Sequence, residues 1–267
     1  MKIDKTNLIY FSPTGTSKTI VESLGLEIGI NRTNDFDLTH DKPISFETDG
    51  NENSLTIIGV PVYRGRVPVE ATQRLKKIKT NKTLAVIVVV YGNRAFEDSL
   101  LELKDIANTC GFNVIAAGAF IGEHSFSITN NKIAAGRPDQ KDLLKVKEFG
   151  EKIKIKLQET IKIKKLDEFK IPGNYPYKEP GPFPSISPDT KNSDCHQCYT
   201  CEDVCPVNAI MVTKTGVITD KASCIWCCAC VKSCPQKVRI FDNPTINGGI
   251  EWLFNNFSQR KEPEFFL

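Results

Sequence analysis

This 267-residue chain contains two runs of cysteines with the same spacing, and their type and spacing suit them to bind an inorganic centre. Each run reads C-x2-C-x2-C-x3-C before a proline, and each member of the second lies 29 residues after its counterpart (224 − 195 = 29). Thiolates at these intervals can converge on one small inorganic centre, as iron–sulfur sites require. A repeat at a fixed offset indicates two such centres in one compact module. The runs comprise Cys195, Cys198, Cys201 and Cys205, then Cys224, Cys227, Cys230 and Cys234.

The doubled run resembles that of bacterial ferredoxins with two [4Fe–4S] clusters, in which the fourth cysteine of each run binds the cluster of the other run. The resemblance implies that one cluster is held by Cys195, Cys198, Cys201 and Cys234. It implies that the other is held by Cys205, Cys224, Cys227 and Cys230. Two interpretations compete with this one. Zinc ribbons use C-x2-C pairs but do not require the doubled run, and a disulfide framework needs an oxidising compartment.

Two cysteines lie outside the repeat. Cys228 directly follows Cys227, where ferredoxin-like sequences often carry glycine, and we expect its side chain to point away from the cluster. The alternative is that Cys228 tunes or partly replaces a ligand. Cys110 ends a predicted helix, and we interpret it as a small buried hydrophobic side chain because no motif supports reactivity.

The uneven distribution of residue types predicts four segments. Nine of the ten cysteines fall between positions 195 and 234, which separates a cluster module from a larger domain. A Pro/Gly-rich stretch between them reads as an extended tether, pinned to a surface by Tyr175, Tyr177 and Phe183. The predicted segments are a globular domain over 1–168, a linker over 169–190, the cluster module over 191–242, and a C-terminal helix and tail over 243–267. An apolar stripe predicts that the helix docks on the protein itself, and it comprises Ile250, Leu253, Phe254 and Phe257.

Charge and hydropathy exclude several classes of partner. The formal net charge of +3 is too small to predict binding to nucleic acid or to an anionic membrane. The longest apolar run, over 84–90, is too short to cross a bilayer, and no basic-then-apolar leader opens the chain. We therefore expect a cytoplasmic protein without membrane insertion, in a reducing and oxygen-poor setting.

The first segment alternates strand-like and helical patterns. Apolar, β-branched runs lie near 7–12, 34–39, 54–60, 83–91 and 113–121. Helical stretches follow at about 15–29, 67–79, 96–110 and 139–165. This alternation predicts an α/β fold, with a doubly wound parallel sheet of five strands. Ligands of such sheets bind beyond the carboxyl ends of the strands.

Three loops at those strand ends carry candidate binding residues. The turn after the first strand places hydroxyls and a glycine before a helix N-terminus, which favours phosphate binding. The same pattern also simply caps helices. The phosphate candidates are Ser12, Thr14, Gly15, Thr16 and Ser17. The loops after the third and fourth strands each combine an aromatic residue, glycine and arginine, and comprise Pro61, Val62, Tyr63, Arg64 and Gly65, then Tyr91, Gly92, Asn93, Arg94 and Ala95.

The turn resembles the S/T-x-T-G-x-T phosphate loop of flavodoxins, and the two later loops match the regions that flank their flavin ring. Residues 1 to about 165 are similar to a short-chain flavodoxin, and the whole chain resembles bacterial flavodoxin–ferredoxin fusion proteins of the EFR1 type. The segments GEHSFS (122–127), AAGRPD (134–139) and RKEPEFFL (260–267) are also typical of that group. The resemblance implies a flavodoxin-like FMN domain followed by a small α+β ferredoxin module with two [4Fe–4S] clusters.

Within that framework we assign expected roles to tyrosine, arginine and histidine side chains. We expect Tyr63 or Tyr91 to stack on the flavin, the alternative being ordinary packing at the rim. Arg64, Arg66 and Arg94 depart from the acidic surroundings usual for flavodoxins and would favour an anionic reduced flavin; alternatively, they bind a partner or face solvent. His124, after the fifth strand, is a candidate for hydrogen bonding to the flavin or for proton transfer, and equally a structural histidine.

The resemblance implies a carrier that links one-electron and two-electron redox partners, such as ferredoxin-dependent oxidoreductases, in anaerobic metabolism. The alternatives are a flavin-dependent reductase that takes electrons from the clusters, and a redox sensor or interaction module. No catalytic triad or carboxylate pair is recognisable in the sequence. The sequence does not predict an oligomeric state.

Overall fold

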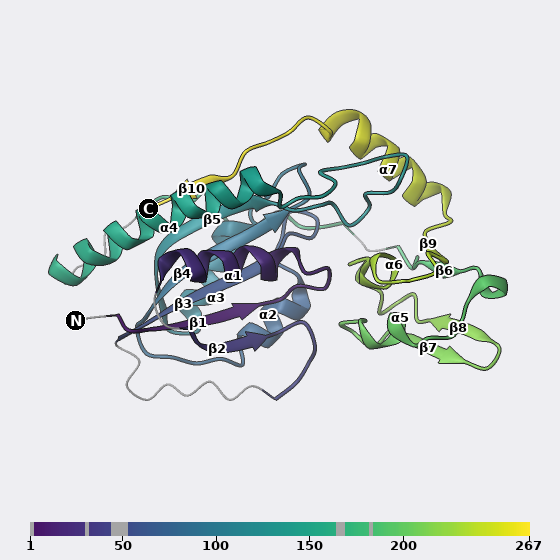
Figure 1. The fold of residues 1–267 in the computed structure, drawn as a ribbon, viewed down its shortest axis with the longest axis horizontal. Coiled ribbons are helices and arrows are strands. Elements are labelled where there is room, and N and C mark those ends of the chain that lie inside the picture. The colour runs from purple at the N-terminus through teal and green to yellow at the C-terminus, as the bar shows by residue number, and fades with distance from the viewer. Residues whose placement is uncertain (1–2, 30–31, 44–52, 164–168, 182–183) are drawn as a thin grey trace.

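The computed structural model describes residues 3–29, 32–43, 53–163, 169–181 and 184–267. A large α/β domain lies beside a smaller cysteine-rich module (Figure 1). The large domain contains a six-stranded sheet in the order β10-β5-β4-β3-β1-β2. Its strands are β1 (Lys5–Tyr10), β2 (Arg32–Asp37), β3 (Ser54–Pro61), β4 (Thr83–Tyr91), β5 (Phe112–Ile121) and β10 (Glu264–Phe266).

The five predicted parallel strands are confirmed. Strands β2, β1, β3, β4 and β5 pair in parallel with their neighbours. The order 2-1-3-4-5 is that of flavodoxin-like doubly wound sheets, with a switch point between β1 and β3. Every residue of β4 is buried, as its unbroken apolar run predicted, because helices cover both faces of the sheet.

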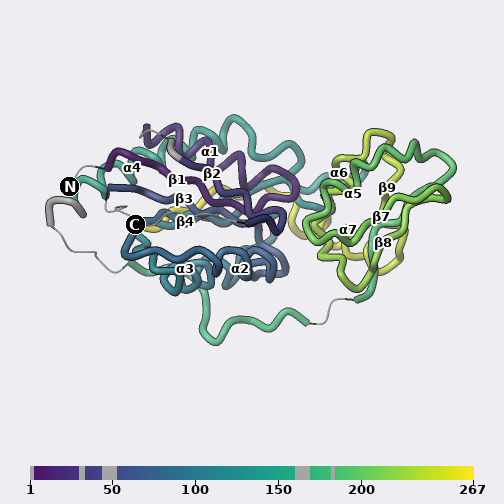
Figure 2. The backbone as a smooth tube through the Cα atoms, turned by 90° about the horizontal axis from the view of Figure 1, so that it is seen from below, coloured from purple at the N-terminus to yellow at the C-terminus, as the bar shows by residue number. Residues whose placement is uncertain are grey.

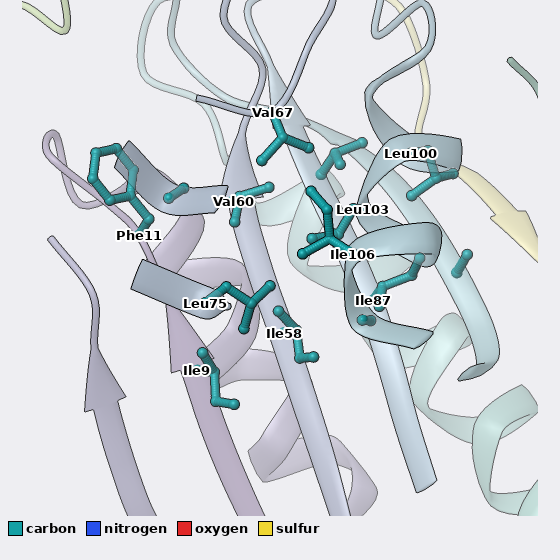
Figure 3. Close-up of a cluster of buried hydrophobic side chains, with 14 of the residues drawn as sticks. Ile9, Phe11, Ile58, Val60, Val67, Leu75, Ile87, Leu100, Leu103 and Ile106 are labelled. Atoms are coloured by element: carbon teal, nitrogen blue, oxygen red, sulfur yellow. The ribbon is translucent and has the colours of Figure 1, made fainter. Parts of the chain in front are cut away.

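Helices cover both faces of the sheet (Figure 2). On one face, Leu24 and Phe149 belong to the core formed by α1 and α4. On the other face, Leu75 and Leu103 pack with strand residues such as Ile58 (Figure 3). Burial on both faces therefore stabilises the sheet that carries the strand-end loops. The helices are α1 (Thr16–Ile28), α2 (Val69–Leu75), α3 (Ser99–Thr109) and α4 (Gln140–Ile163).

The sixth strand, β10, departs from the five-stranded expectation. It comes from the C-terminal tail and pairs antiparallel with β5 at the edge of the sheet. Phe265 stacks on Phe149 with ring centroids 4.7 Å apart and packs against Phe120 at 5.6 Å. A strand of three residues is too short to show a periodic pattern, so its place depends on this tertiary packing.

The cysteine module consists of two similar halves. Helix α5 (Thr200–Asp203) and helix α6 (Ala229–Lys232) start 29 residues apart (229 − 200 = 29), the same offset as the cysteines. A hairpin is formed by β7 (Ile210–Thr213) and β8 (Gly216–Thr219). Strand β6 (Asp189–Thr190) pairs antiparallel with β9 (Arg239–Ile240), and the short helix η2 (Asn192–Asp194) precedes the first cysteine.

The described part of the linker lies along α3, as expected for a pinned tether. The backbone N–H groups of Asn174 and Lys178 donate to the carboxylate of Asp98 at 2.9 and 2.6 Å. The Tyr177 hydroxyl donates to Asp105. Tyr175, in contrast, is 80% exposed and does not pin the chain. The predicted anchor Phe183 and the predicted domain boundary at 168 lie outside the described residues.

The C-terminal helix, α7 (Pro244–Phe257), begins beside the cysteine module, and the tail after it returns to the sheet (Figure 1). Of the predicted stripe, Ile250 and Leu253 are buried, whereas Phe254 and Phe257 are half-buried. We call α7 and the tail that follows it the C-terminal arm. The helix therefore docks on its own chain.

Candidate cofactor sites

The loop after β1 has the shape of an anion site. Gly15 stands at the N-cap of α1 with φ 84°, in the left-handed region that glycine adopts without strain. Ser12 Oγ accepts a hydrogen bond from the Lys18 N–H at 3.0 Å, which ties the loop to the first turn of the helix. The first N–H groups of a helix lack intrahelical acceptors, and the described first turn of α1 carries no acidic residue. The loop therefore presents donors and the positive end of a helix dipole.

Ser17, the second residue of α1, carries a hydroxyl in the first turn after this loop. Its side chain is fully buried, and its Oγ has no hydrogen-bond partner among the residues that the structure describes. Leaving a buried hydroxyl unpaired costs about 1–3 kcal/mol. A phosphate oxygen would satisfy it.

A cavity of about 490 Å³, the strand-end cavity, lies next to this loop. It stands at the carboxyl ends of β1, β3, β4 and β5, where doubly wound sheets bind ligands. Twelve of the sixteen predicted flavin-site residues line it, which brings together loops that are far apart in sequence. They are Thr14, Thr16, Pro61, Val62, Tyr63, Arg64, Gly65, Tyr91, Gly92, Arg94, Ala95 and His124.

The other four predicted residues do not line the cavity. Ser12, Gly15 and Ser17 shape the loop after β1. Asn93 is buried and is directed toward the C-terminal arm, where its Nδ2 donates to the carbonyl oxygens of Phe257 and Gln259 at 2.6 and 2.7 Å. The side chain of Asn93 therefore fastens the arm.

Two tyrosines form part of the cavity wall. Tyr91 is buried against Phe96, with ring centroids 5.5 Å apart, and burial raises the pKa of its hydroxyl to about 12. Tyr63 is half-buried, and burial together with the nearby Cys227 and Cys228 thiols also raises its pKa. Both hydroxyls are therefore protonated at neutral pH.

The three arginines have different surroundings. Arg66 forms a bidentate pair with Glu102 at 2.8 and 2.9 Å, and it does not line the strand-end cavity. Arg94 lines the cavity but pairs with Glu97 at 2.6 Å, which offsets much of its charge. Arg64 lines the cavity as well. The expected cationic surroundings are thus largely neutralised at two of the three positions.

His124 lies at the cavity with one ring nitrogen already used. Its Nδ1 accepts a hydrogen bond from the Phe126 N–H at 3.0 Å, so in the neutral ring the proton is on Nε2. Burial, together with the charges of Lys232 and Arg94, lowers the pKa of His124 to about 4. At neutral pH, His124 is therefore an uncharged donor.

Other segments complete the cavity, and sequence reasoning did not assign them to it. They come from the linker, from the second cysteine run and from α7. The apolar stripe of α7 was a signal that it docks, but nothing in the sequence indicated on which surface. The lining residues from these three segments are Lys178, Glu179, Pro180 and Gly181; Ile225 and Trp226; and Thr245, Ile246, Gly249, Trp252 and Leu253.

The cysteines surround two further cavities. The first cysteine cavity is lined by Cys195, Cys198, Cys201 and Cys234. The second cysteine cavity is lined by Cys205, Cys224, Cys227 and Cys230, and Cys228, which we expected to point away, lines it as well. In the described part of the chain, no three His, Cys, Asp or Glu side chains converge as ligands of a single metal ion would. A cluster does not require such convergence, since each thiolate binds a different iron. The structure thus groups the cysteines in the two sets that the ferredoxin resemblance implies.

Backbone conformation repeats with the cysteines. Residues with positive φ occur in pairs 29 positions apart (226 − 197, 228 − 199 and 237 − 208 all give 29). Cys228 is one of them, with φ 60°, which explains why glycine suits this position. Its thiol is buried and donates to the Trp226 carbonyl at 3.6 Å. The two halves therefore wrap their cavities with the same local geometry.

Single side chains connect the three cavities. Ile225 lines both the strand-end cavity and the second cysteine cavity. Arg239, which is 2% exposed, lines both cysteine cavities, and its Nη2 lies 3.7 Å from the Cys230 sulfur. The second cysteine cavity is therefore next to the strand-end cavity, and the first cysteine cavity lies beyond it.

Polar and aromatic contacts hold the module against the large domain. Arg74 of α2 is buried and donates to the Pro206 carbonyl at 2.7 Å. Lys232 pairs with Glu123 at 2.5 Å. Burial alone would raise the pKa of Glu123, but hydrogen bonds from the Gly136 N–H and from Lys232 hold it below its usual range.

Known proteins resemble the two parts of the chain separately. A family model described as a 4Fe-4S binding domain matches residues 190–211. The polyferredoxin-like subunit of an aliphatic sulfonate oxidoreductase from Pyrococcus furiosus is 50% identical over 48 residues, which are 16% of this chain and 28% of that protein. The chain thus matches little more than a quarter of that relative's length.

Solved structures resemble the large domain. A flavodoxin from the Archaea covers 58% of this chain and 99% of its own length, with 14% identity and a TM-score of 0.38. Oxidised flavodoxin 1 from Bacillus cereus covers 55% and 95%, with 16% identity and a TM-score of 0.38. The Flv1 flavodiiron core from Synechocystis covers 60% and 37%, with 16% identity and a TM-score of 0.43. Because these scores are low, the fold class depends on the strand order of the domain itself.

Among the described residues, no helix has the length and apolar character needed to cross a membrane. The chain combines a flavodoxin-like domain with a 4Fe-4S binding domain. This combination indicates a role in electron transfer.

Proposed function

We propose that the chain carries electrons between an FMN in the strand-end cavity and two [4Fe–4S] clusters in the cysteine cavities. FMN exchanges one or two electrons and each cluster exchanges one, so the assembly links two-electron and one-electron redox partners. The proposal includes the sequence-based segments, the two cysteine sets and the FMN contacts given above. It places the chain with flavodoxin–ferredoxin fusion proteins.

The observation that carries the proposal is the position of Ile225. This side chain separates the strand-end cavity from the second cysteine cavity, so groups bound in the two cavities would be close neighbours. In the same way, Arg239 lines both cysteine cavities, so groups bound in those two cavities would also be neighbours. We therefore place the cluster of Cys205, Cys224, Cys227 and Cys230 beside the flavin. The other cluster is the outer one, and its Cys198 is exposed.

The residues present fit FMN. The loop after β1 offers helix N–H groups and the unpaired Ser17 hydroxyl to a phosphate. The cavity beside it is lined by aromatic and apolar side chains, as ring-binding sites commonly are. The neutral His124 and the backbone of the β3 and β4 loops supply polar groups around it.

Iron, acid-labile sulfide and extracted flavin should be measured on one anaerobically purified sample. We expect about eight irons, matching sulfide and one FMN per chain. About four irons would refute the two-cluster proposal, and zinc in place of iron would refute the electron-transfer proposal. A cluster content of eight irons without flavin would refute the proposed role of the strand-end cavity.

The order of the centres has its own test. We expect a Cys198→Ser variant to disturb the outer cluster while the flavin still exchanges electrons with the inner one after flash photoreduction. A Cys227→Ser variant should disturb the inner cluster and abolish rapid exchange with the flavin. Equal loss of rapid exchange in both variants would contradict the order.

A further inference from the structure

One face of helix α7 forms a wall of the strand-end cavity. Of all the segments that line this cavity, α7 is the farthest in sequence from the loop after β1. The five residues of this face follow the helical period, and they are Thr245, Ile246, Gly249, Trp252 and Leu253. None of the five is charged. The wall therefore suits a flat, largely apolar surface.

A glycine, Gly249, lies in the middle of this face, and close packing does not explain why the position is glycine. Two consecutive glycines, Gly248 and Gly249, stand inside the 14-residue helix, and each costs about 1 kcal/mol of helix stability relative to alanine. A Cβ atom added at Gly249 would meet no atom within 4 Å, so close packing against the protein does not explain the residue. Since Gly249 lines the cavity, a larger side chain would project toward the cavity space.

Helix α7 is capped at its start and attached to the large domain at its end. At the start of α7, Asn243 Oδ1 accepts from the Thr245 N–H at 3.0 Å. At the other end, Asn93 binds the carbonyl oxygens of Phe257 and Gln259, and the neighbours of Asn93 in the β4 loop, Gly92 and Arg94, line the same cavity. The C-terminal end of α7 is therefore attached to the β4 loop by direct hydrogen bonds.

We propose that α7 is the outer wall of the flavin site and that Gly249 provides the clearance for the isoalloxazine ring. This inference rests on the proposed binding of FMN. It makes the C-terminal arm part of the cofactor site.

Gly248 supplies a matched control. It is exposed, it does not line the strand-end cavity, and a Cβ added there would also meet no atom within 4 Å. Replacing either glycine by the same residue changes the helix propensity of α7 by the same amount. The pair thus separates filling of the cavity from stabilisation of the helix.

The experiment compares Gly249→Leu with Gly248→Leu, and Gly249→Ala with Gly248→Ala, in the full chain prepared anaerobically. FMN affinity is measured by the flavin retained per chain over a range of free FMN, with iron per chain as the check on folding. We expect Gly249→Leu to weaken FMN binding by about tenfold or more, because an overpacked site must shift or expel its ligand. Gly248→Leu should stay within about twofold, and both should keep the iron of the wild type.

The alanine pair keeps the test decisive if the leucine variant loses iron. Gly249→Ala should alter the visible spectrum or the midpoint potential of the bound flavin, whereas Gly248→Ala should not. Equal FMN affinity and equal flavin spectra at the two positions would overturn the role of α7 while leaving FMN binding intact. A wild-type chain that binds no FMN at all would overturn the proposed function and this inference together.

Discussion

Cys228 shows how a residue next to a predicted ligand can differ from it in role. Cys227 and Cys228 both line the second cysteine cavity, but the Cys228 thiol donates to a backbone carbonyl. Its φ of 60° costs roughly 1–2 kcal/mol in a residue with a side chain. Local geometry therefore favours glycine at this position.

We predict that Cys228→Gly retains the full iron content. The free energy of unfolding should stay within about 1 kcal/mol of the wild type, because relief of the backbone strain offsets the lost burial of the side chain. Iron analysis and thermal unfolding under nitrogen measure both quantities. Cys227→Ser is the control that should lose iron, and a comparable loss in Cys228→Gly would show that Cys228 is a ligand.

Arg239 places a buried positive charge between the two cysteine sets. Its guanidinium donates to Thr190 Oγ1 at 2.7 Å and to Thr219 Oγ1 at 3.1 Å, which fixes it beside Cys230. Charge and hydrogen bonds to the sulfurs tune cluster potentials.

We predict that Arg239→Gln shifts the reduction potential of the inner cluster to more negative values, since a positive charge stabilises the reduced, more negative cluster. Redox titration followed by electron paramagnetic resonance measures the shift. Lys221→Gln removes an exposed charge from the same module and should have a much smaller effect. Equal shifts in the two variants would contradict a specific role of the buried arginine.

His124 gives the stability of the chain a dependence on pH. Its pKa falls from 6.5 to about 4 in the folded protein, chiefly through burial. Between these values the unfolded chain binds more protons than the folded one, so stability decreases as the pH falls from 6.5 toward 4. We predict that His124→Gln flattens this part of the curve. Melting temperatures between pH 7.5 and 5 measure it, and parallel curves for both proteins would refute the assignment.

At the scale of elements, the C-terminal arm contributes to the fold of a domain far from it in sequence. Strand β10 extends the sheet beyond β5, and Phe265 covers the aromatic pair of Phe120 and Phe149. Arg260 strengthens the attachment through an ion pair with Asp139 at 2.6 Å.

We predict that Phe265→Ala lowers the free energy of unfolding of the large domain by about 1–3 kcal/mol, because it removes stacking and apolar burial at the edge of the core. Denaturant unfolding measures the change. Glu264→Ala, at the exposed neighbouring position of the same strand, should have an effect within about 0.5 kcal/mol. Similar effects of the two substitutions would show that β10 does not pack as described.

At the scale of the whole molecule, the two parts are docked through buried polar groups. Arg74 joins the end of β2 to the cysteine module, since it donates to the carbonyl oxygens of Leu38, Thr39 and Pro206. Its loss would leave these buried acceptors without a partner.

We predict that Arg74→Met destabilises the chain by about 1–3 kcal/mol and slows electron exchange between the flavin and the inner cluster. Denaturant unfolding and flash photoreduction measure the two effects. Lys77→Met removes a nearby exposed ion pair with Asp41 and should change neither by much. Unchanged exchange in Arg74→Met would indicate that this contact does not set the distance between the centres.

Much of this architecture could be predicted from residue spacing. The spacing of the cysteine repeat, through its resemblance to two-cluster ferredoxins, predicted two sets of four cysteines, and these sets line two separate cavities. The alternation of apolar runs and helical patterns predicted the parallel sheet, since burial on both faces demands continuous apolar strands. The predicted topology indicated that the loops at the strand ends carry the binding residues, and twelve of their sixteen predicted residues line one cavity.

The tertiary structure decided what covers that cavity. Nothing local indicates that Asn93 binds the end of α7 rather than a ligand, or that Ile225 stands between two cavities. These contacts join residues more than a hundred positions apart, and they form only when the large domain, the cysteine module and the C-terminal arm pack together. Neighbouring residues determine the periodicity of a helix or strand, whereas the surface on which it docks depends on the packing of the whole chain.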